Sequence, residues 1–260
     1  SYPMLWTIEN MQFTGVDKSG TNYEDRGGVI RVDVEDAEHI LSLNNVIISG
    51  NKACRGAAIS FVGGNRSSKV VARNSLFKNN VATHYGVVLY SPVVEFDEVM
   101  FINNNGQGTG RGILAAVIGT LNNILVSGNS STNGGFIRSG NVTISNSIFK
   151  GNSASDNGGV FAKDGTGGMI LRLYNSEFRN NSAQNYGAVF ETATIEIAHN
   201  CTFDSNIAVD ENGGVAFGGT STIVNSVFLY NEADGGGVFD RGTHKVVNSL
   251  FRGNSVSTTH

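Results

Sequence analysis

Three carboxylates are the best candidate for a metal site in this 260-residue sequence. Asp210 and Glu211 are adjacent, and Asp234 follows Asp210 after 24 residues, one unit of the repeat described below. Equivalent positions in stacked coils lie about 4.8 Å apart, so these side chains could approach one another. Carboxylate oxygens are the ligands that Ca²⁺ prefers. Asp210, Glu211 and Asp234 are therefore a candidate Ca²⁺ site, with a solvated acidic loop as the alternative interpretation.

Four basic residues each follow a phenylalanine directly: Lys78, Lys150, Arg179 and Arg252. Neighbouring side chains of a strand point to opposite faces, so the basic residues point outward if the phenylalanines point inward. Lys150 and Arg179 would then be neighbours on one face. Such a stripe could bind sulfated or acidic glycans, and ordinary solubilising charge is the alternative.

The sequence offers little for catalysis. The histidines (His39, His84, His199, His244 and His260) have no metal-ligand spacing, and no paired-carboxylate motif recurs on one strand. Polysaccharide lyases and hydrolases need acid and base carboxylates, or clustered carboxylates that hold Ca²⁺. We expect no catalytic residue, no cofactor and no enzymatic activity, and we keep a polysaccharide lyase or hydrolase as an alternative.

Glycosylation sequons occur at Asn65, Asn129, Asn141, Asn180 and Asn200. Asn129 and Asn200 belong to regular asparagine columns, so we expect them inside the fold or in its turns. Asn65, Asn141 and Asn180 are the candidate acceptors, and their use would require a eukaryotic secretory route.

Composition excludes several classes of protein. The net charge is −4, which provides no electrostatic footprint for nucleic acid, and no apolar run approaches the length of a membrane span. Glycine (34 residues) and asparagine suit short strands and tight turns rather than helices. The two cysteines, Cys54 and Cys201, are far apart along the chain, and we expect both to be free and buried.

A repeat of 23–25 residues, with longer units in three places, organises the whole chain. Its clearest form is Asn146-Ser147-Ile148-Phe149-Lys150-Gly151-Asn152, followed by Gly158-Gly159-Val160-Phe161. We call the central apolar residue the anchor. The ten anchors are Phe13, Ile48, Phe77, Phe101, Val126, Phe149, Phe178, Phe203, Phe228 and Phe251.

Asparagine stands three residues after nine of the ten anchors, and Gly or Asn stands two residues after eight. Gly and Asn adopt left-handed conformations at low cost, which predicts a sharp corner there. An inward asparagine could satisfy the corner amides and its neighbours, and the phenylalanines could stack. The predicted ladder residues are Asn51, Asn80, Asn104, Asn129, Asn152, Asn181, Asn206, Asn231 and Asn254, with Phe77, Phe101, Phe149, Phe178, Phe203, Phe228 and Phe251.

The remainder of each unit predicts two further strands. After the corner come variable polar residues, a glycine-led strand such as Gly236-Gly237-Val238-Phe239, and a strand that leads to the next anchor, such as Ser221–Val224. Three short strands in about 25 residues are one coil of a parallel β-solenoid, which buries its apolar face by stacking. We therefore expect an all-β parallel β-helix of about ten coils, as a single domain over residues 1–260.

The pairing of Phe-x-x-Asn with Gly-Gly-Ala/Val/Ile resembles the repeat of the chlamydial polymorphic outer-membrane proteins. Seven Phe-x-x-Asn segments are in register, and examples of the glycine half are Gly134-Gly135, Gly187-Ala188-Val189 and Gly213-Gly214-Val215. The resemblance implies a right-handed β-helix, an autotransporter passenger and an adhesive role.

We expect an extracellular or cell-surface adhesin that binds a host or neighbouring cell-surface protein or glycan. The sequence indicates no cap at either end, so we expect a segment of a longer solenoid. Alternatively, the chain is the subunit of an extracellular fibre that self-associates end to end.

Overall fold

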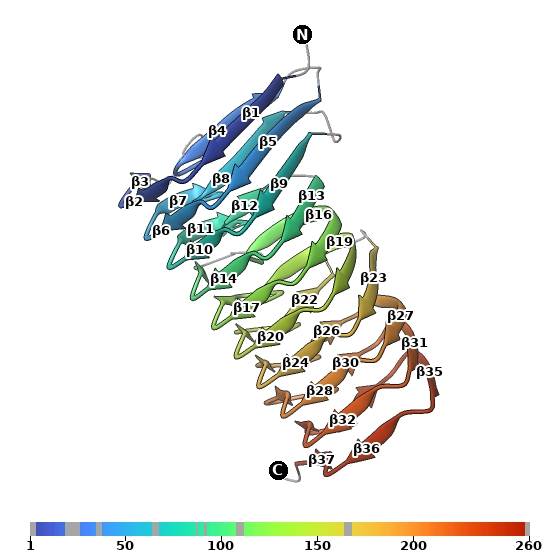
Figure 1. Ribbon diagram of the computed structural model, residues 1–260. Coiled ribbons are helices and arrows are strands. Elements are labelled where there is room, and N and C mark those ends of the chain that lie inside the picture. The colour runs from blue at the N-terminus through green and yellow to red at the C-terminus, as the bar shows by residue number, and fades with distance from the viewer. Residues whose placement is uncertain are drawn as a thin grey trace.

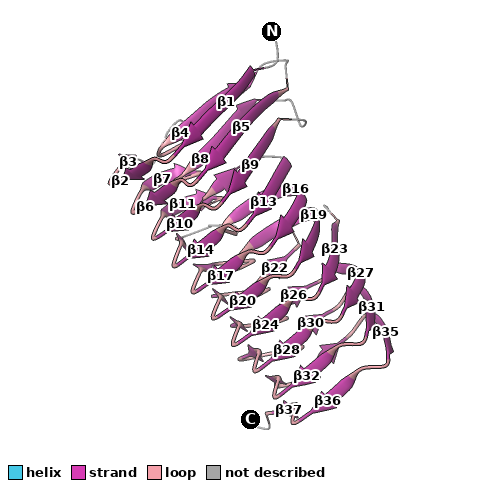
Figure 2. Ribbon diagram, in the orientation of Figure 1, coloured by secondary structure: helices cyan, strands magenta, loops and turns pink. Residues whose placement is uncertain are grey.

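The chain folds as a parallel β-solenoid. The computed structural model describes residues 4–18, 27–34, 38–63, 68–86, 88–90, 93–107, 112–163 and 168–257. The coils stack along one axis, and the two ends of the chain lie at opposite ends of the stack (Figure 1). Throughout the described residues the regular structure is strand, with no helix (Figure 2). Those residues therefore include no helix that could span a membrane.

Sheet B has ten parallel strands, one from each repeat, and carries the anchors. Its strands are β2 (Gln12–Thr14), β6 (Ile47–Ser49), β10 (Leu76–Lys78), β14 (Met100–Ile102), β17 (Leu125–Ser127), β20 (Ile148–Lys150), β24 (Glu177–Arg179), β28 (Thr202–Asp204), β32 (Val227–Leu229) and β36 (Leu250–Arg252). The anchor Phe149 is buried, whereas its neighbours Ile148 and Lys150 face outward. The apolar residues that precede several anchors are thus surface residues.

Sheet C also has ten strands, each directly after a corner. They are β3 (Asp17–Lys18), β7 (Lys52–Arg55), β11 (Val81–Tyr85), β15 (Asn105–Gly106), β18 (Ser130–Ser131), β21 (Ser153–Ala154), β25 (Ser182–Ala183), β29 (Ile207–Ala208), β33 (Glu232–Ala233) and β37 (Ser255–Val256). The sequence predicted only variable polar residues here.

Sheet A has 17 strands in two rows. One row leads to the anchors: β1 (Met4–Glu9), β5 (His39–Asn44), β9 (Lys69–Arg73), β13 (Val93–Asp97), β16 (Leu114–Asn122), β19 (Ile137–Ser145), β23 (Met169–Tyr174), β27 (Thr194–His199), β31 (Thr220–Val224) and β35 (Thr243–Val247). The other row follows the glycines: β4 (Ile30–Val34), β8 (Ile59–Gly63), β12 (Leu89–Tyr90), β22 (Phe161–Ala162), β26 (Phe190–Glu191), β30 (Ala216–Phe217) and β34 (Phe239–Asp240). The long strands β16 and β19 pair with both rows and join them.

Two details of the predicted coil were wrong. The predicted glycine-led and anchor-leading strands share sheet A, and the third sheet is the one that the sequence did not predict. The leading glycines also form a corner rather than the start of a strand: Gly158 has φ +64°, and β22 begins only at Phe161. A Cβ on Gly159 would lie 2.1 Å from the Ala188 carbonyl oxygen, so glycine is required by the close approach of the next coil.

The predicted corner after the anchor is confirmed. The residue two positions after the anchor has positive φ in all ten repeats, including Ser205 and Tyr230, whose types did not predict it. A second left-handed corner lies three residues before each anchor, where Asn146 has φ 52°. Asparagine occupies that position in nine repeats because it tolerates this conformation better than most residues.

The predicted aromatic column is also confirmed. The rings of Phe149 and Phe178 stack with centroids 4.8 Å apart, and those of Phe178 and Phe203 are 5.1 Å apart. A second set of rings from sheet A, including Phe161 and Phe190, packs against this column at steep angles. Neighbouring coils therefore bury continuous aromatic surface, which no single coil could do.

One repeat has a small anchor, Val126, and the space beside it in the core is filled by a side chain from the opposite side of the coil. Val126 replaces phenylalanine in the column between Phe101 and Phe149. Phe136, directly before β19, occupies a position that is valine or isoleucine in the neighbouring described coils, and its ring lies 5.1 Å from that of Phe101 and 5.6 Å from that of Phe149. Large and small side chains have exchanged places in this coil, so its volume is kept.

The asparagine ladder forms as predicted. Asn152 donates its backbone N–H (3.1 Å) and its Nδ2–H (3.0 Å) to Oδ1 of Asn181, and Nδ2 also donates to the Val126 carbonyl (3.1 Å). Each such asparagine therefore connects three coils. The ladder residues from Asn51 to Asn231 are fully buried and Asn254 is half-buried.

A serine column runs beside the ladder, two residues before the anchors. Ser147 Oγ accepts the N–H of Ile124 (3.2 Å) and donates to the Ser145 carbonyl (2.6 Å). Cys201 occupies the same column, and its N–H donates to Ser226 Oγ. Both cysteines are free and buried, as predicted.

Candidate ligand-binding face

The outer side of sheet C carries a shallow groove of about 400 Å³. Its strands are only two residues long in β18, β21 and β25, with the first residue half-buried on the outside and the second buried. The inward residues are small, as in Ala154 and Ala183, so this wall lies close to the core. Sheet C therefore lies lower than the corners on either side of it, and this difference in height forms the groove.

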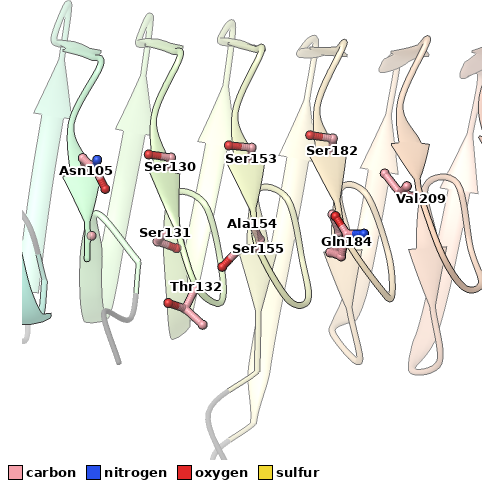
Figure 3. Close-up of a pocket in the computed structure, with 12 residues that line it drawn as sticks. Asn105, Ser130, Ser131, Thr132, Ser153, Ala154, Ser155, Ser182, Gln184 and Val209 are labelled. Atoms are coloured by element: carbon pink, nitrogen blue, oxygen red, sulfur yellow. The ribbon is translucent and has the colours of Figure 1, made fainter. Parts of the chain in front are cut away.

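Two columns of uncharged polar side chains line this groove, which we call the hydroxyl groove. Asn105, Ser130, Ser153 and Ser182 are paired in register, so they repeat about every 4.8 Å (Figure 3). Two residues further along, Thr132, Ser155 and Gln184 form the second column. The backbone amides of Ser155 and Gln184 each donate to the preceding coil, which keeps this column in register.

The hydroxyls of the groove differ in their hydrogen bonds. Ser131 Oγ is directed inward and donates to the Asn133 and Gly134 carbonyls. Ser130, Ser153, Ser155 and Ser182 make no side-chain hydrogen bond to the part of the chain that the structure describes. Each of these hydroxyls can therefore donate to and accept from a ligand.

The described residues that line the hydroxyl groove include no charged side chain. At one end it meets the exposed apolar residues Ile207 and Val209 of the next coil. Beyond Gln184 along the chain, the Tyr186 ring stacks on Phe217 at 4.1 Å, and the Arg241 guanidinium lies 5.3 Å from the Phe217 ring centroid. The face therefore suits a neutral polar ligand with some apolar surface, such as a sugar.

The candidate Ca²⁺ site is not assembled. Among the described residues, no group of three His, Cys, Asp or Glu side chains could hold a metal ion. Asp210 accepts a hydrogen bond from Gln184 Nε2, Glu211 hydrogen-bonds Tyr186, and Asp234 accepts one from Ser257 Oγ (2.6 Å). Each of the three carboxylates therefore has a separate side-chain partner, and they do not share one site.

The basic residues face outward on sheet B, and Lys150 pairs in register with Arg179 as predicted. They do not form a continuous stripe. Ile102 and Ser127 separate Lys78 from Lys150, and Arg179 forms an ion pair with Glu177 (3.1 Å). The ion pair and the interruption weaken this face as an anion-binding surface.

The described sequons differ in exposure. Asn129 is fully buried in the ladder, so a glycan cannot be attached there in the folded chain. Asn141, Asn180 and Asn200 are exposed, and the last two lie at corners with positive φ. Asn65 lies outside the described residues.

Within the described parts of the chain, three titratable groups have shifted pKa values. Burial raises the pKa of the Cys201 thiol to about 11. Burial also raises the pKa of the Glu191 carboxyl, and Asp156 adds to this shift, while a backbone hydrogen bond with Lys163 and the charges of Arg138 and Lys163 oppose it. The hydrogen bond with Glu211 raises the pKa of the Tyr186 hydroxyl.

Sequence reasoning missed the hydroxyl groove, although a signal was present. Ser153-Ala154 and Ser182-Ala183 recur directly after a ladder asparagine, and Ser130-Ser131 occupies the same place. Two residues are too few to display strand periodicity, so the pairs resemble loop residues.

No protein-family model matches the chain, and no curated protein matches it.

Proposed function

We propose that this chain is a non-enzymatic extracellular surface protein, an adhesin- or passenger-type β-helix stalk that presents the hydroxyl groove to a glycan or protein on a host or neighbouring cell. The observation that carries the proposal is the uncharged double column of Ser130, Ser153 and Ser182 with Thr132 and Ser155. The resemblance of the repeat to chlamydial surface proteins supports the same function.

The stacked core supports a stalk because it fixes the spacing of the surface. Outward side chains of successive coils follow the register of the ladder, so a ligand meets a regular array rather than a mobile loop. Pre-organised polar groups lose little conformational freedom when they bind, which favours weak contacts repeated along a chain-like ligand.

A glycan array tests this proposal with matched variants. Ser153→Glu places a charge in the hydroxyl groove, and Ser127→Glu places the same charge on the outward side of sheet B. We expect the wild type and Ser127→Glu to bind the same neutral glycans, and Ser153→Glu to lose them while its circular dichroism is unchanged. Equal glycan binding by the wild type, Ser153→Glu and Ser127→Glu would show that the hydroxyl groove does not bind the glycan.

The array also tests the basic residues of sheet B. Sulfated glycans that bind the wild type and are lost in Lys150→Glu, but retained in Ser153→Glu, would place recognition on sheet B instead. Absence of binding to any glycan would leave a protein partner, which a host-cell adhesion assay with Ser153→Glu and Ser127→Glu would test.

Glu191 is the observation that favours a second candidate, a polysaccharide hydrolase or lyase. A carboxyl with a raised pKa can act as a general acid, and Arg138, Lys163 and Asp156 influence its charge. Reducing ends or unsaturated products released from polysaccharides by the wild type but not by Glu191→Gln would support an enzyme. Release of no product by the wild type would count against it.

A further inference from the structure

The outer face of sheet B carries a continuous apolar stripe across five successive coils. Each residue of the stripe stands directly before an anchor and points outward, and the five are paired in register along the stack (Figure 1). Met100 and Ile148 are 40% and 36% exposed, and the other three are half-buried. At about 4.8 Å per coil, the stripe is roughly 20 Å long. It consists of Ile47, Leu76, Met100, Leu125 and Ile148.

Polar residues border the stripe. In the same column Gln12 lies before it, and Glu177 and Thr202 lie after it. The parallel column directly after the anchors contains Lys78 and Lys150, with serine or isoleucine in the coils between and before them. Contiguous exposed apolar surface with a polar rim is typical of an interaction surface. The stripe therefore indicates a contact with another molecule.

The positions of the two lysines favour a second copy of this chain as that molecule. Lys78 lies one coil before Ile102, and Lys150 lies two coils after it. A two-fold axis that runs along β14 turns the second copy antiparallel and places its Ser127 opposite Lys78. The same axis places Ser49 of the second copy opposite Lys150. Each lysine thus faces a small uncharged side chain rather than another charge.

The same axis also places apolar residues opposite apolar residues. Leu76 of one copy lies opposite Leu125 of the other. Ile47 lies opposite Ile148, and Met100 lies opposite its own equivalent. Sheets that pack face to face lie about 10 Å apart, and their side chains interdigitate. The stripe is therefore self-complementary, because packing it against its own copy removes apolar surface of both chains from water.

Other arrangements of the two copies are less favourable. An axis midway between β14 and β17 sets Lys78 opposite Lys150, and an axis along β17 sets Lys78 opposite Arg179. An axis midway between β10 and β14 sets Lys78 against Ile102. A two-fold axis parallel to the stack places the stripe of one copy on the lysine column of the other, which would bury amines against apolar side chains. These unfavourable contacts select the register along β14 against its neighbours.

We propose that the outer face of sheet B binds a second copy of this chain, stripe on stripe and antiparallel, with the two-fold axis along β14. The contact covers only a few short strands, which is less than the interface of a stable dimer, so the association is weak and reversible. Exposed Glu98 meets its own equivalent at the rim, where solvent screens the repulsion. The hydroxyl groove lies on sheet C, outside this contact, so the dimer presents two grooves to a ligand.

Sedimentation equilibrium of the full chain tests the proposal at concentrations from about 1 µM to 1 mM. Leu125→Gln places an amide in the stripe, and Val227→Gln is a matched control at an outward apolar position of β32, outside the stripe. We expect the apparent mass of the wild type and of Val227→Gln to rise toward twice that of the monomer. Leu125→Gln should remain a monomer while its circular dichroism is unchanged. A wild type that stays monomeric at every concentration, or equal association of Leu125→Gln, would overturn the proposal.

An exchange of charge tests the register. Ser127→Lys places the introduced amine opposite Lys78 of the second copy, twice in each dimer, and should weaken association about threefold or more. Adding Lys78→Glu should restore association, because each introduced amine then faces an introduced carboxylate. A double variant that associates no better than Ser127→Lys, or a Ser127→Lys variant that associates like the wild type, would overturn the antiparallel register along β14.

Discussion

Asn152 donates two hydrogens to one atom, Oδ1 of Asn181 in the following coil, from its backbone at 3.1 Å and from its side chain at 3.0 Å. The same side chain also donates to the carbonyl of Val126 in the preceding coil. An amide is the smallest side chain that offers an acceptor and two donors together. This explains why asparagine recurs at this corner, while the outward residues beside it vary.

The exchange of large and small side chains in the core can be reversed experimentally. Val126→Phe should destabilise the fold by about 1–3 kcal/mol, because Phe136 already fills the space beside the column. Phe136→Val alone should leave a cavity and cost about 2–4 kcal/mol. The double variant restores the Phe and Val arrangement of the neighbouring coils, so its urea midpoint should exceed those of both single variants. A double variant no more stable than either single one would show that the exchange is not compensatory.

Cys201 should have the same structural role as the serines that occupy the equivalent position in other coils. The fold buries the thiol and raises its pKa to about 11, so it should remain protonated at neutral pH and resist a thiol reagent until the protein is denatured. Cys201→Ser should keep the stability within about 1 kcal/mol, because Ser147 makes the expected hydroxyl bonds in the equivalent place. Rapid labelling of the native protein, or a large loss in Cys201→Ser, would contradict this assignment.

Glu191 predicts a dependence of stability on pH. Its raised pKa means that the folded state favours the protonated carboxyl. The stabilising effect is therefore complete below the ordinary glutamate pKa of about 4.3 and is lost as pH rises through the folded-state pKa. The urea midpoint of the wild type should fall between pH 4 and pH 7 relative to that of Glu191→Gln, which stays neutral. A constant difference between the two proteins, or one that changes in the opposite direction, would refute the shift.

The sequence predicted the features that recur with a distinctive residue type. Phe149 and Asn152 identified the coil, the aromatic column and the ladder because their spacing repeats along the chain. The outward direction of Ile148 was not predicted, since an apolar residue beside an apolar anchor does not reveal which of the two is buried.

The features that were missed depend on contacts between coils. Gly158 resembles the start of a strand, but its positive φ places it at a corner, and at Gly159 beside it the next coil approaches too closely for a side chain. The hydroxyl groove was missed because Ser153 and Ser182 form a column only after the coils are stacked. The candidate Ca²⁺ site was predicted from positions that are close in the repeat. In the structure, Asp210, Glu211 and Asp234 do not gather into a group that could hold a metal ion.

The most direct test of the central claim, that the buried ladder holds the solenoid together, is the free energy of unfolding of Asn152→Ala from urea titration. The substitution removes the acceptor shared by Asn129 N–H and Asn129 Nδ2 inside the fully buried core, and Asn254→Ala removes the equivalent acceptor at the half-buried last coil. We predict a loss of about 2–4 kcal/mol for Asn152→Ala and a clearly smaller loss for Asn254→Ala, where water can replace the bonds. An unchanged free energy in Asn152→Ala, or equal losses in the two variants, would contradict the account.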